Sequence, residues 1–449
     1  MAASQRRPNI IFFFTDQQRA DTVGCYGSPM GLTQNLDAMA SEGVRFELAF
    51  TAQPVCGPAR SLLQSGLYPT ATGCFRNGIA LPLETRTIAH QMRDAGYEVG
   101  YIGKWHLAST QGVPGEPSVD YTTKPVPPER RGGYDDFWLA ADILEFTSSP
   151  YGGGYFDGDG DFVPFDGYRV ESQTDHVLDY LRTRDGEKPF FLFLSYLEPH
   201  HQNDLNRYVA PHGYAERYEE YPVPGDLIGQ DGGDWQENLP DYYGICASID
   251  ENLGRLRAEL ERLGLADDTL ILYTTDHGSH FRTRNSEYKR SCHEASIRLP
   301  MVACGPGCRG GKVKDDLVSL VDVPPTLLEW AGIEAPEHYH GRSLQPLVDG
   351  TAVDWPDEVF VQISESQVGR AIRTKRWKYC IDAPDKSGWR DADSPRYVEQ
   401  YLYDLQADPH ERTNLVGDPG YRQVADELAE RLIARMVAAG EKAPEIVTA

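Results

Sequence analysis

Short apolar runs alternate with amphipathic segments along the first three quarters of the chain, and this alternation restricts the folds that are open to it. Strand-like runs occupy residues 9–16, 97–104, 189–201 and 268–278. Helical patterns occupy residues 33–43, 86–96, 169–184 and 242–264. Consecutive apolar residues, as in NIIFFF, are typical of strands that are buried on both faces. The sequence therefore predicts an α/β fold with a large, mainly parallel sheet flanked by helices.

The pattern changes after about residue 355. Residues 358–365, 369–381 and 399–411 look like antiparallel strands joined by tight turns, and residues 421–440 look like a closing helix. A chain of 449 residues is long enough for one large domain and a smaller one. We therefore expect a catalytic α/β domain over residues 1–355 and a C-terminal α+β subdomain with an antiparallel sheet over 356–449.

The charge balance limits the possible partners. The formal net charge is -25, from 43 Lys and Arg against 68 Asp and Glu. This disfavours nucleic acid or an anionic membrane surface as a general partner. No segment approaches the roughly 18 apolar residues that a membrane span needs. The N-terminus lacks a small-residue cleavage site and the eight cysteines lack framework spacing, so we expect a cytoplasmic protein.

Polar residues follow the predicted strands. In open α/β sheets, ligands bind beyond the carboxyl ends of the strands. The residues at or just after these ends are Asp16, Lys104, His200, Asp276 and His277. We expect them to converge on one edge of the sheet.

Two of these strand ends carry candidate metal ligands. Asp16 is followed by Gln17, and Asp276 is followed by His277. Two carboxylates, an amide oxygen and an imidazole suit Ca²⁺, Mg²⁺ or Mn²⁺. The alternative is that both acids simply cap the turns that follow them.

Cys56 lies in the stretch QPVCGPARSLLQSGLYPT, which contains proline and glycine next to the cysteine. Pro58 favours an extended or turn geometry at Cys56 and Gly57, with a helix from about Ala59 to Gly66. A cysteine at a helix N-terminus, with Arg60 one turn further on, is placed to form an activated thiolate. An ordinary turn cysteine is the alternative.

Several blocks resemble the type I sulfatases. CGPAR (56–60) fits their Cys-x-Pro-x-Arg signature, and SGLYPTATG (65–73) resembles its continuation. Further similar blocks, in family order, are GKWHL (103–107), EPHH (198–201), TTDHG (274–278), KRSCHEASIRLP (289–300) and SLVDVPPTLLEWAGI (319–333). The resemblance implies an alkaline-phosphatase-like fold and a sulfuric ester hydrolase that releases inorganic sulfate.

The resemblance also implies that a formylglycine-generating maturation enzyme oxidises Cys56 to Cα-formylglycine. One hydroxyl of the hydrated aldehyde attacks sulfur, and the other then expels sulfate. The implied catalytic residues are Cys56, Arg60, Lys104, His106, His200 and Lys289. Arg60 and Lys104 would hold the nucleophile's oxyanion and Lys289 the sulfate oxygens. His106 would be the base of the second step and His200 the general acid.

The metal shell departs from the usual family pattern. Many sulfatases carry two adjacent acids on the first strand and an Asp-Asn pair on the later one, where this chain has Gln17 and His277. The expected metal set is Asp16, Gln17, Cys56, Asp276 and His277, with Ca²⁺ preferred and Mn²⁺ or Mg²⁺ as alternatives. A similar combination occurs in phosphonate monoester and phosphodiester hydrolases of the superfamily, which makes that activity the alternative. A non-catalytic sulfoglycan-binding relative is disfavoured because the catalytic set is complete.

Polar side chains beside these motifs predict a sulfated carbohydrate, as a small molecule or an oligosaccharide. The candidate substrate-binding residues are Arg76, Asn77, Trp105, His201, Arg282, Arg290 and His293. Trp105 is expected to stack on a sugar ring. The alternative for each of the others is a surface pair with one of the many acids.

Overall fold

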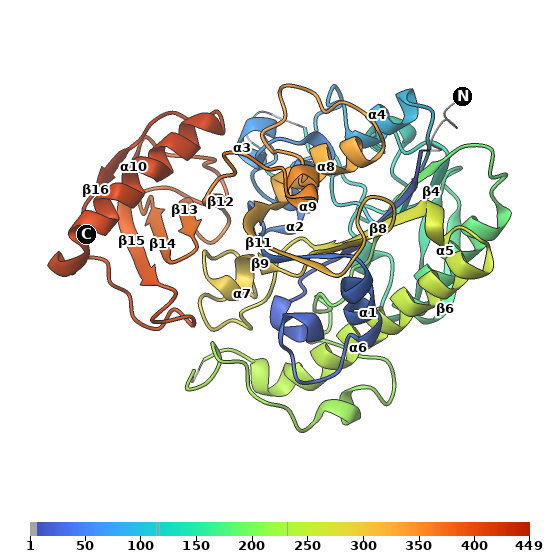
Figure 1. Cartoon of the computed structure of the whole chain (residues 1–449), viewed down its shortest axis with the longest axis horizontal. Helices are drawn as coiled ribbons and strands as arrows, with labels where there is room; N and C mark the ends of the chain where they lie inside the picture. Colours follow the sequence, from blue (N-terminus) through green and yellow to red (C-terminus); the bar gives the residue numbers. More distant parts are fainter. Residues whose placement is uncertain (1–6, 114, 116, 231) are drawn as a thin grey trace.

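The computed structural model describes residues 7–449 except 114, 116 and 231. Two sheets organise these residues, one of 11 strands and one of five. In Figure 1 the large sheet fills the centre and right of the molecule, and the smaller sheet lies on the left with the C-terminal helix. The two predicted sheets are both present.

Parallel strands form the centre of the large sheet. They are, in spatial order, β8 (Thr269–Thr275), β1 (Asn9–Thr15), β7 (Phe190–Ser195), β3 (Glu98–Lys104) and β4 (Phe137–Ala141). All of the first four correspond to predicted strands. Their parallel pairing brings their carboxyl ends to one edge.

Antiparallel strands complete both flanks, so the whole sheet is mixed. On one side, β10 (Val302–Cys304) runs antiparallel to both β8 and β2 (Val44–Phe50), and β11 (Lys312–Ser319) is parallel to β2. The two-residue strand β9 (Arg298–Leu299) also pairs with β2. On the other side, β5 (Tyr151–Asp157) and β6 (Phe162–Tyr168) form a hairpin next to β4.

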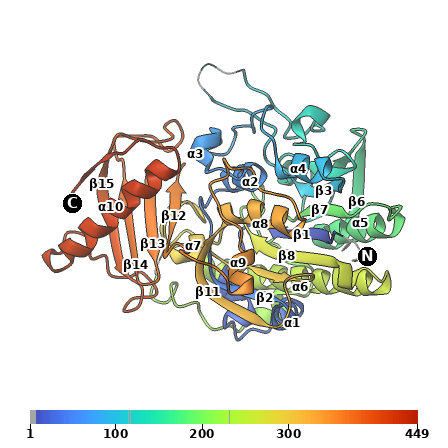
Figure 2. The same ribbon diagram turned by 45° about the horizontal axis from the view of Figure 1, so that its top comes forward.

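Helices cover both faces of this sheet (Figures 1 and 2). One face carries α1 (Gln34–Glu42), α5 (Arg169–Thr183) and α6 (Trp235–Arg262). The other carries α2 (Cys56–Ser65), α4 (Ile88–Asp94), α8 (Val323–Trp330) and α9 (Gln345–Asp349). The short helices α3 (Pro69–Thr72) and α7 (Glu294–Ile297) lie in connecting segments. Helix α6 starts earlier than predicted because its first turns accommodate Pro240.

Strand β1 shows why an uninterrupted apolar run belongs here. Ile10, Phe12 and Phe14 pack into the core beneath α2, α4 and α8. Ile11 and Phe13 pack into the core beneath α1, α5 and α6. Successive strand side chains point to opposite faces, so a strand with two buried faces has no polar positions to alternate with.

The smaller sheet begins at Glu358. Strands β12 (Glu358–Ile363), β13 (Gly369–Thr374), β14 (Trp377–Asp382) and β15 (Arg396–Asp404) are antiparallel, and β16 (Glu445–Val447) adds a parallel edge. One face packs against α10 (Arg422–Ala438). The other face packs on Phe50, Ile297 and Leu317 of the large unit, so an apolar contact fixes the two sheets together.

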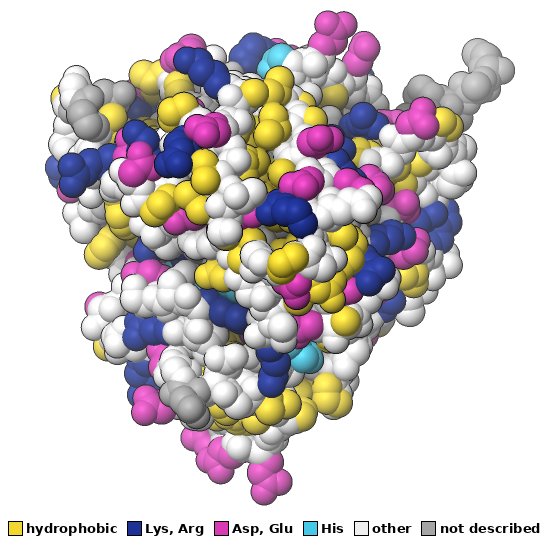
Figure 3. Space-filling model, turned by 90° about the vertical axis from the view of Figure 1, so that its left-hand side faces the viewer, with side chains coloured by type: hydrophobic (Ala, Val, Ile, Leu, Met, Phe, Trp, Pro, Cys, Tyr) yellow, Lys and Arg dark blue, Asp and Glu magenta, His cyan; other side chains and the backbone are white. Residues whose placement is uncertain are grey.

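The surface carries both signs of charge. Figure 3 shows basic and acidic side chains interspersed over the face that includes the C-terminal sheet. Among the described residues, no helix is both long and apolar enough to cross a bilayer.

Candidate active site

The predicted strand-end residues meet at one edge of the large sheet. Asp16 directly follows β1, Lys104 is the last residue of β3, and Asp276 directly follows β8. Lys104 Nζ lies 2.9 Å from Asp16 Oδ2, and His277 Nε2 lies 3.5 Å from Asp276 Oδ1. His200 joins them through Lys289, whose Nζ lies 3.1 Å from His200 Nε2. The predicted convergence is therefore present.

Cys56 is the first residue of helix α2. The predicted helix start at Ala59 was wrong by one turn, because Val55, not Gly57, is the extended residue before the helix. Pro58 is tolerated in the first turn, where backbone N–H groups have no partner inside the helix. The N–H of Gly57 instead donates to Asn77 Oδ1 at 2.9 Å. Cys56 thus occupies the positive end of the helix.

The thiol of Cys56 lies among three charged or basic groups. Its Sγ is 2.9 Å from Lys289 Nζ, 3.3 Å from His277 Nε2 and 3.5 Å from Asp16 Oδ1. Burial and Asp16 raise the pKa of this thiol, but Lys104, Lys289 and His277 lower it to about 6. Burial raises the pKa of the Cys74 thiol to about 12 although hydrogen bonds with Thr72 and Ser61 lower it, so position 56 is not an ordinary buried turn cysteine.

Arg60 and Lys104 are buried cations that contact Asp16. Arg60 Nη2 donates to Asp16 Oδ2 at 3.1 Å, and its Nη1 donates to the Lys104 carbonyl and to Ser195 Oγ, both at 2.7 Å. Burial raises the pKa of Asp16, but Lys104, His200, Lys289 and Arg60 together lower it well below its usual value. Asp16 is therefore held as a carboxylate.

The second carboxylate faces the same space. Asp276 Oδ1 accepts the N–H of Gln17 at 3.0 Å and that of His277 at 2.8 Å, while its buried Oδ2 accepts no hydrogen bond from the described residues. Burial and the charge of Asp16 raise the pKa of Asp276 to about 7. Oδ2 lies 4.0 Å from Arg60 Nη2, and a cation bound closer to this oxygen would stabilise the charged form of the buried carboxylate pair.

These groups fit a divalent cation. One ligand atom from each of Asp16, Cys56, Asp276 and His277 lies within 4.8 Å of the others. His277 Nδ1 donates to the Gly278 carbonyl at 2.9 Å, which directs the lone pair of Nε2 into the group. Gln17 Nε2 donates to Tyr208 OH at 2.6 Å, which leaves the amide oxygen on the side of Lys289. The oxygen-rich set with one imidazole suits Ca²⁺ or Mn²⁺.

His200 is a neutral imidazole that is paired with Lys289. Its Nδ1 donates to the His201 carbonyl at 2.6 Å, so Nε2 is free to accept from Lys289 Nζ. Burial and the charge of Lys289 lower the pKa of His200 well below its usual value. His200 must therefore take up a proton at Nε2 before it can act as an acid.

His106 follows Lys104 by two residues and lies within its electrostatic influence. Its backbone is in the left-handed region at φ 60, and its buried Nδ1 accepts or donates no hydrogen bond within the described part of the chain. Burial and Lys104 lower the pKa of His106 to about 4, so the ring is neutral and can accept a proton. Glu145, which the sequence patterns did not indicate, places Oε1 3.7 Å from Lys104 Nζ.

The candidate substrate-binding residues separate into two groups. Arg76, Asn77, His201, Arg282 and Arg290 lie close to the catalytic residues. Asn77 caps Gly57, His201 stacks on His200 with 4.4 Å between ring centroids, and Arg290 follows Lys289 in the chain. Arg282 makes an ion pair with Asp234 and lies over the ring of Tyr288.

Trp105 and His293 do not fit substrate binding. Trp105 is fully buried, and its ring packs edge-on against Tyr101, Tyr134 and Trp138. The prediction that it stacks on a sugar is therefore wrong. Backbone direction explains the error: the side chain after Lys104 turns into the core. His293 is buried beside Tyr403, with 3.3 Å between Nε2 and the hydroxyl oxygen.

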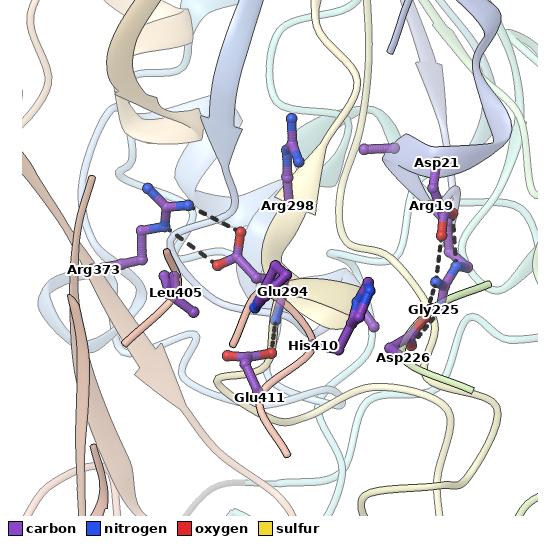
Figure 4. A pocket seen from close by; sticks show the side chains of 13 residues that line it. Arg19, Asp21, Gly225, Asp226, Glu294, Arg298, Arg373, Leu405, His410 and Glu411 are labelled. Atoms are coloured by element: carbon purple, nitrogen blue, oxygen red, sulfur yellow. Dashed lines mark hydrogen bonds and ion pairs between the residues drawn. The ribbon is translucent and has the colours of Figure 1, made fainter. Parts of the chain in front are cut away.

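A cavity of about 290 Å³ lies apart from this cluster, between the large unit and the C-terminal sheet. Its lining includes Arg19, Asp226, Glu294, Arg373 and Glu411. Figure 4 shows that these charged side chains point toward one another, with Arg373 on Glu294 and Arg19 on Asp226. The cavity is thus bordered by internal ion pairs and contains none of the predicted catalytic residues.

Comparison with known proteins agrees with this geometry. The family model described as Sulfatase matches residues 8–333, which is most of the chain. The chain belongs to the sulfatase family. It is therefore a sulfuric ester hydrolase of the alkaline phosphatase superfamily, and the predicted alkaline-phosphatase-like fold is confirmed. A second model, described as N-sulphoglucosamine sulphohydrolase, C-terminal, matches residues 286–438.

Sulfatase relatives match nearly the whole chain. An ulvan-active sulfatase of Formosa agariphila is 29% identical, over 97% of this chain and 82% of its own length. An N-acetylglucosamine-6-O-sulfatase of Bacteroides thetaiotaomicron is 26% identical, over 95% of this chain and 86% of its own length. The crystal structure of the sulfatase-like protein yidJ of Bacteroides fragilis has a TM-score of 0.84 and 27% identity, and the match covers 98% of each chain.

Proposed function

We propose that this sulfatase hydrolyses the sulfate ester of a carbohydrate, with a Cα-formylglycine formed from Cys56 and a divalent cation. The observation that carries the proposal is the position of Cys56 Sγ, which lies 2.9 Å from Lys289 Nζ within the group formed with Asp16, Asp276 and His277. An atom at this point is both the candidate nucleophile and a neighbour of the candidate metal ligands Asp16, Asp276 and His277.

A formylglycine at position 56 supplies a hydrated aldehyde, whose two hydroxyls serve in turn as nucleophile and as the group that expels sulfate. A cation held by Asp16, Gln17, Asp276 and His277 supplies positive charge to the sulfate oxygens and lowers the pKa of the attacking hydroxyl. Ca²⁺ is the preferred ion because oxygen donors dominate the set, and Mn²⁺ or Mg²⁺ are the alternatives.

The chain's own residues carry the remaining tasks. Lys289 neutralises sulfate oxygens at the position now next to Cys56 Sγ, and Arg60 and Lys104 hold Asp16 and the nucleophile's oxygen. His200, once protonated at Nε2 in the complex with the anionic sulfate ester, gives that proton to the departing alcohol oxygen as the sulfur–oxygen ester bond breaks, and solvent supplies the next proton after the product has left. His106, neutral at physiological pH, takes the proton of the second hydroxyl as sulfate leaves.

A sulfated carbohydrate is supported by the polar surroundings of the nucleophile. Asn77, His201 and Arg290 lie next to the catalytic residues. The two relatives named for ulvan and for N-acetylglucosamine 6-sulfate act on the same class of compound, as their names state. We expect a small or oligosaccharide substrate and, because the cysteines are free thiols, a reducing cytoplasmic setting.

Mass spectrometry tests the nucleophile. The tryptic peptide that contains residue 56 should weigh about 18 Da less than the cysteine form, because CHO replaces CH₂SH. The protein should be co-expressed with a formylglycine-generating enzyme, and Cys74 in the same digest serves as the unmodified control. An unshifted mass in fully active protein would refute the formylglycine mechanism.

Phosphonate monoester or phosphodiester hydrolysis is the alternative, and Gln17 and His277 are the observation that favours it. The two activities are separated by kcat/KM for matched aryl sulfate and aryl phosphonate esters, each with Ca²⁺ and with Mn²⁺. We expect the sulfate ester to be preferred with either ion. A preference for the phosphonate by tenfold or more would reverse the assignment.

A further inference from the structure

Trp389 belongs to the C-terminal part of the chain, but it contacts two arginines from segments next to the candidate catalytic residues. It lies in the connection between β14 and β15, and 47% of its surface is exposed. The Arg290 guanidinium lies 5.5 Å from its ring centroid and that of Arg76 lies 5.9 Å away. Among the described residues, Trp389 is the only tryptophan with a large exposed surface.

A short chain of contacts connects this ring to the nucleophile. Arg290 Nη2 pairs with Glu365 Oε2 at 2.5 Å. Glu365 Oε1 accepts the N–H of Asn77 at 2.7 Å, and Asn77 Oδ1 accepts the N–H of Gly57, next to Cys56. Lys289, whose Nζ touches Cys56, precedes Arg290 in the chain. Trp389 therefore lies beside the site and not on a remote surface.

The ring is held in place although it is exposed. Gly388 accepts the N–H of Glu365 at 3.0 Å, and a Cβ at Gly388 would come within 2.7 Å of that same nitrogen. Only glycine permits this approach of the two backbone segments. Glu365 itself is buried with φ 66, a conformation that only the surrounding contacts can maintain.

The two arginines are fixed by protein acceptors. Arg76 donates to the carbonyls of Asn77, Gln111 and Gly112, and Arg290 pairs with Glu365. Their guanidinium groups therefore position the indole, which offers the free apolar surface. Arg290 also pairs with Glu287 at 3.3 Å, so the positive charge beside the indole comes from Arg76, which forms no ion pair with the described residues. An aromatic surface next to fixed cations suits a sugar ring that bears anionic groups.

We propose that Trp389 is the platform on which a sugar ring of the sulfated substrate packs, and that the C-terminal sheet thereby contributes to substrate selection. The proposal rests on the proposed function, because it takes the substrate to be a sulfated saccharide. Trp389 has the role that the sequence analysis gave to the buried Trp105.

The test compares Trp389→Ala and Trp389→Tyr with wild type and with Leu83→Ala, a control that removes a 57% exposed apolar side chain elsewhere. Each protein is assayed for sulfate release from sulfated mono- and disaccharides and from a short alkyl sulfate that has no ring. For Trp389→Ala we expect KM for the saccharide to rise tenfold or more while kcat changes less than twofold. The alkyl sulfate should be hydrolysed at the wild-type kcat/KM, and Trp389→Tyr should recover most of the saccharide affinity.

Two results would refute the proposal that a sugar ring packs on Trp389. One is an unchanged saccharide KM in Trp389→Ala, and the other is an equal loss on the alkyl sulfate, which would indicate a general disturbance of the site. Binding to Cys56→Ala protein, followed by tryptophan fluorescence, separates the platform from the catalytic proposal. If wild type releases no sulfate, the proposed function fails; saccharide binding that depends on Trp389 would still support the platform, and binding that does not would refute it.

Discussion

The side-chain nitrogen of Lys289 lies 2.9 Å from the sulfur of Cys56, although 233 positions separate the two residues. In the proposed mechanism, the ammonium group would lie where charge develops on a sulfate that is bonded to residue 56. Preorganised cations of this kind act strongly because the site is closed to water and needs no rearrangement.

Replacement of Lys289 by methionine should lower kcat/KM for sulfate esters by about 10²–10³-fold, the usual loss for one preorganised donor. The same change at Lys375, whose exposed ammonium pairs with Asp315, is the matched control. Steady-state kinetics with an aryl sulfate measure both. A loss below threefold at Lys289 would remove it from the catalytic set.

Replacement of Asp276 by alanine should abolish tight binding of the divalent cation, since the remaining carboxylate, imidazole and amide form an incomplete shell. Metal per chain, measured by mass spectrometry after dialysis, should fall from about one to near zero. Asp267→Ala, which removes a 95% exposed side-chain carboxylate, should retain the metal. Equal metal content in both variants would show that the ion binds elsewhere.

Replacement of Arg60 by lysine should destabilise the protein while it preserves the charge. Lysine cannot donate at once to Asp16, Ser195 and the Lys104 carbonyl, so buried acceptors lose their partners. We expect a loss of about 1–3 kcal/mol in unfolding free energy, which is the usual cost of leaving a buried hydrogen-bond acceptor without a partner. Denaturant unfolding should show no such loss for Arg309→Lys, whose pair with Asp267 is exposed.

The ion pairs beside the cavity of Figure 4 should make the contact between the two sheets sensitive to acid. Burial raises the pKa of Glu294, but Arg373 and Lys378 lower it well below its usual value, and Lys378 also contacts Glu411. A carboxyl whose folded pKa is depressed contributes stability above its unfolded pKa of about 4.3 and loses that contribution as the pH falls.

Glu294→Gln should therefore reduce the unfolding free energy by about 3 kcal/mol at pH 7. The difference from wild type should shrink as the pH falls below about 4. Glu445→Gln, at an exposed ion pair with Arg396, is the control. Thermal scans across this pH range measure the effect, and a difference that stays constant with pH would contradict it.

Sequence reasoning located the strand-end residues because their signal is local. Asp16 and Asp276 each end an apolar run, and β1 and β8 are parallel neighbours, so both had to meet at one edge. Ser195 ends β7 in the same way and could have been found by the same rule. The motif locates Cys56, but the sequence pattern predicts its helix one turn too late, because Pro58 is compatible with the first turn of a helix.

Other features depend on contacts that no local pattern encodes. Trp105 follows a catalytic lysine in the sequence, yet its direction was decided by the aromatic core around Tyr101. Glu365 and Trp389 come from the second sheet, and their place beside Asn77 depends on how that sheet docks. The spacing of residues in the sequence does not indicate how the second sheet docks on the rest of the protein.

The pairing of β1 with β8 brings together residues that are synthesised at different times. Asp16 and Cys56 acquire Asp276, His277 and Lys289 as neighbours only after those residues have left the ribosome. The 233 positions between Cys56 and Lys289 take roughly 10–50 s to translate at about 5–20 residues per second. During that interval the cysteine, 1% exposed in the finished fold, is on a chain that still lacks its later neighbours His277 and Lys289. Because the strands are synthesised in this order, residue 56 is accessible to other molecules during that interval.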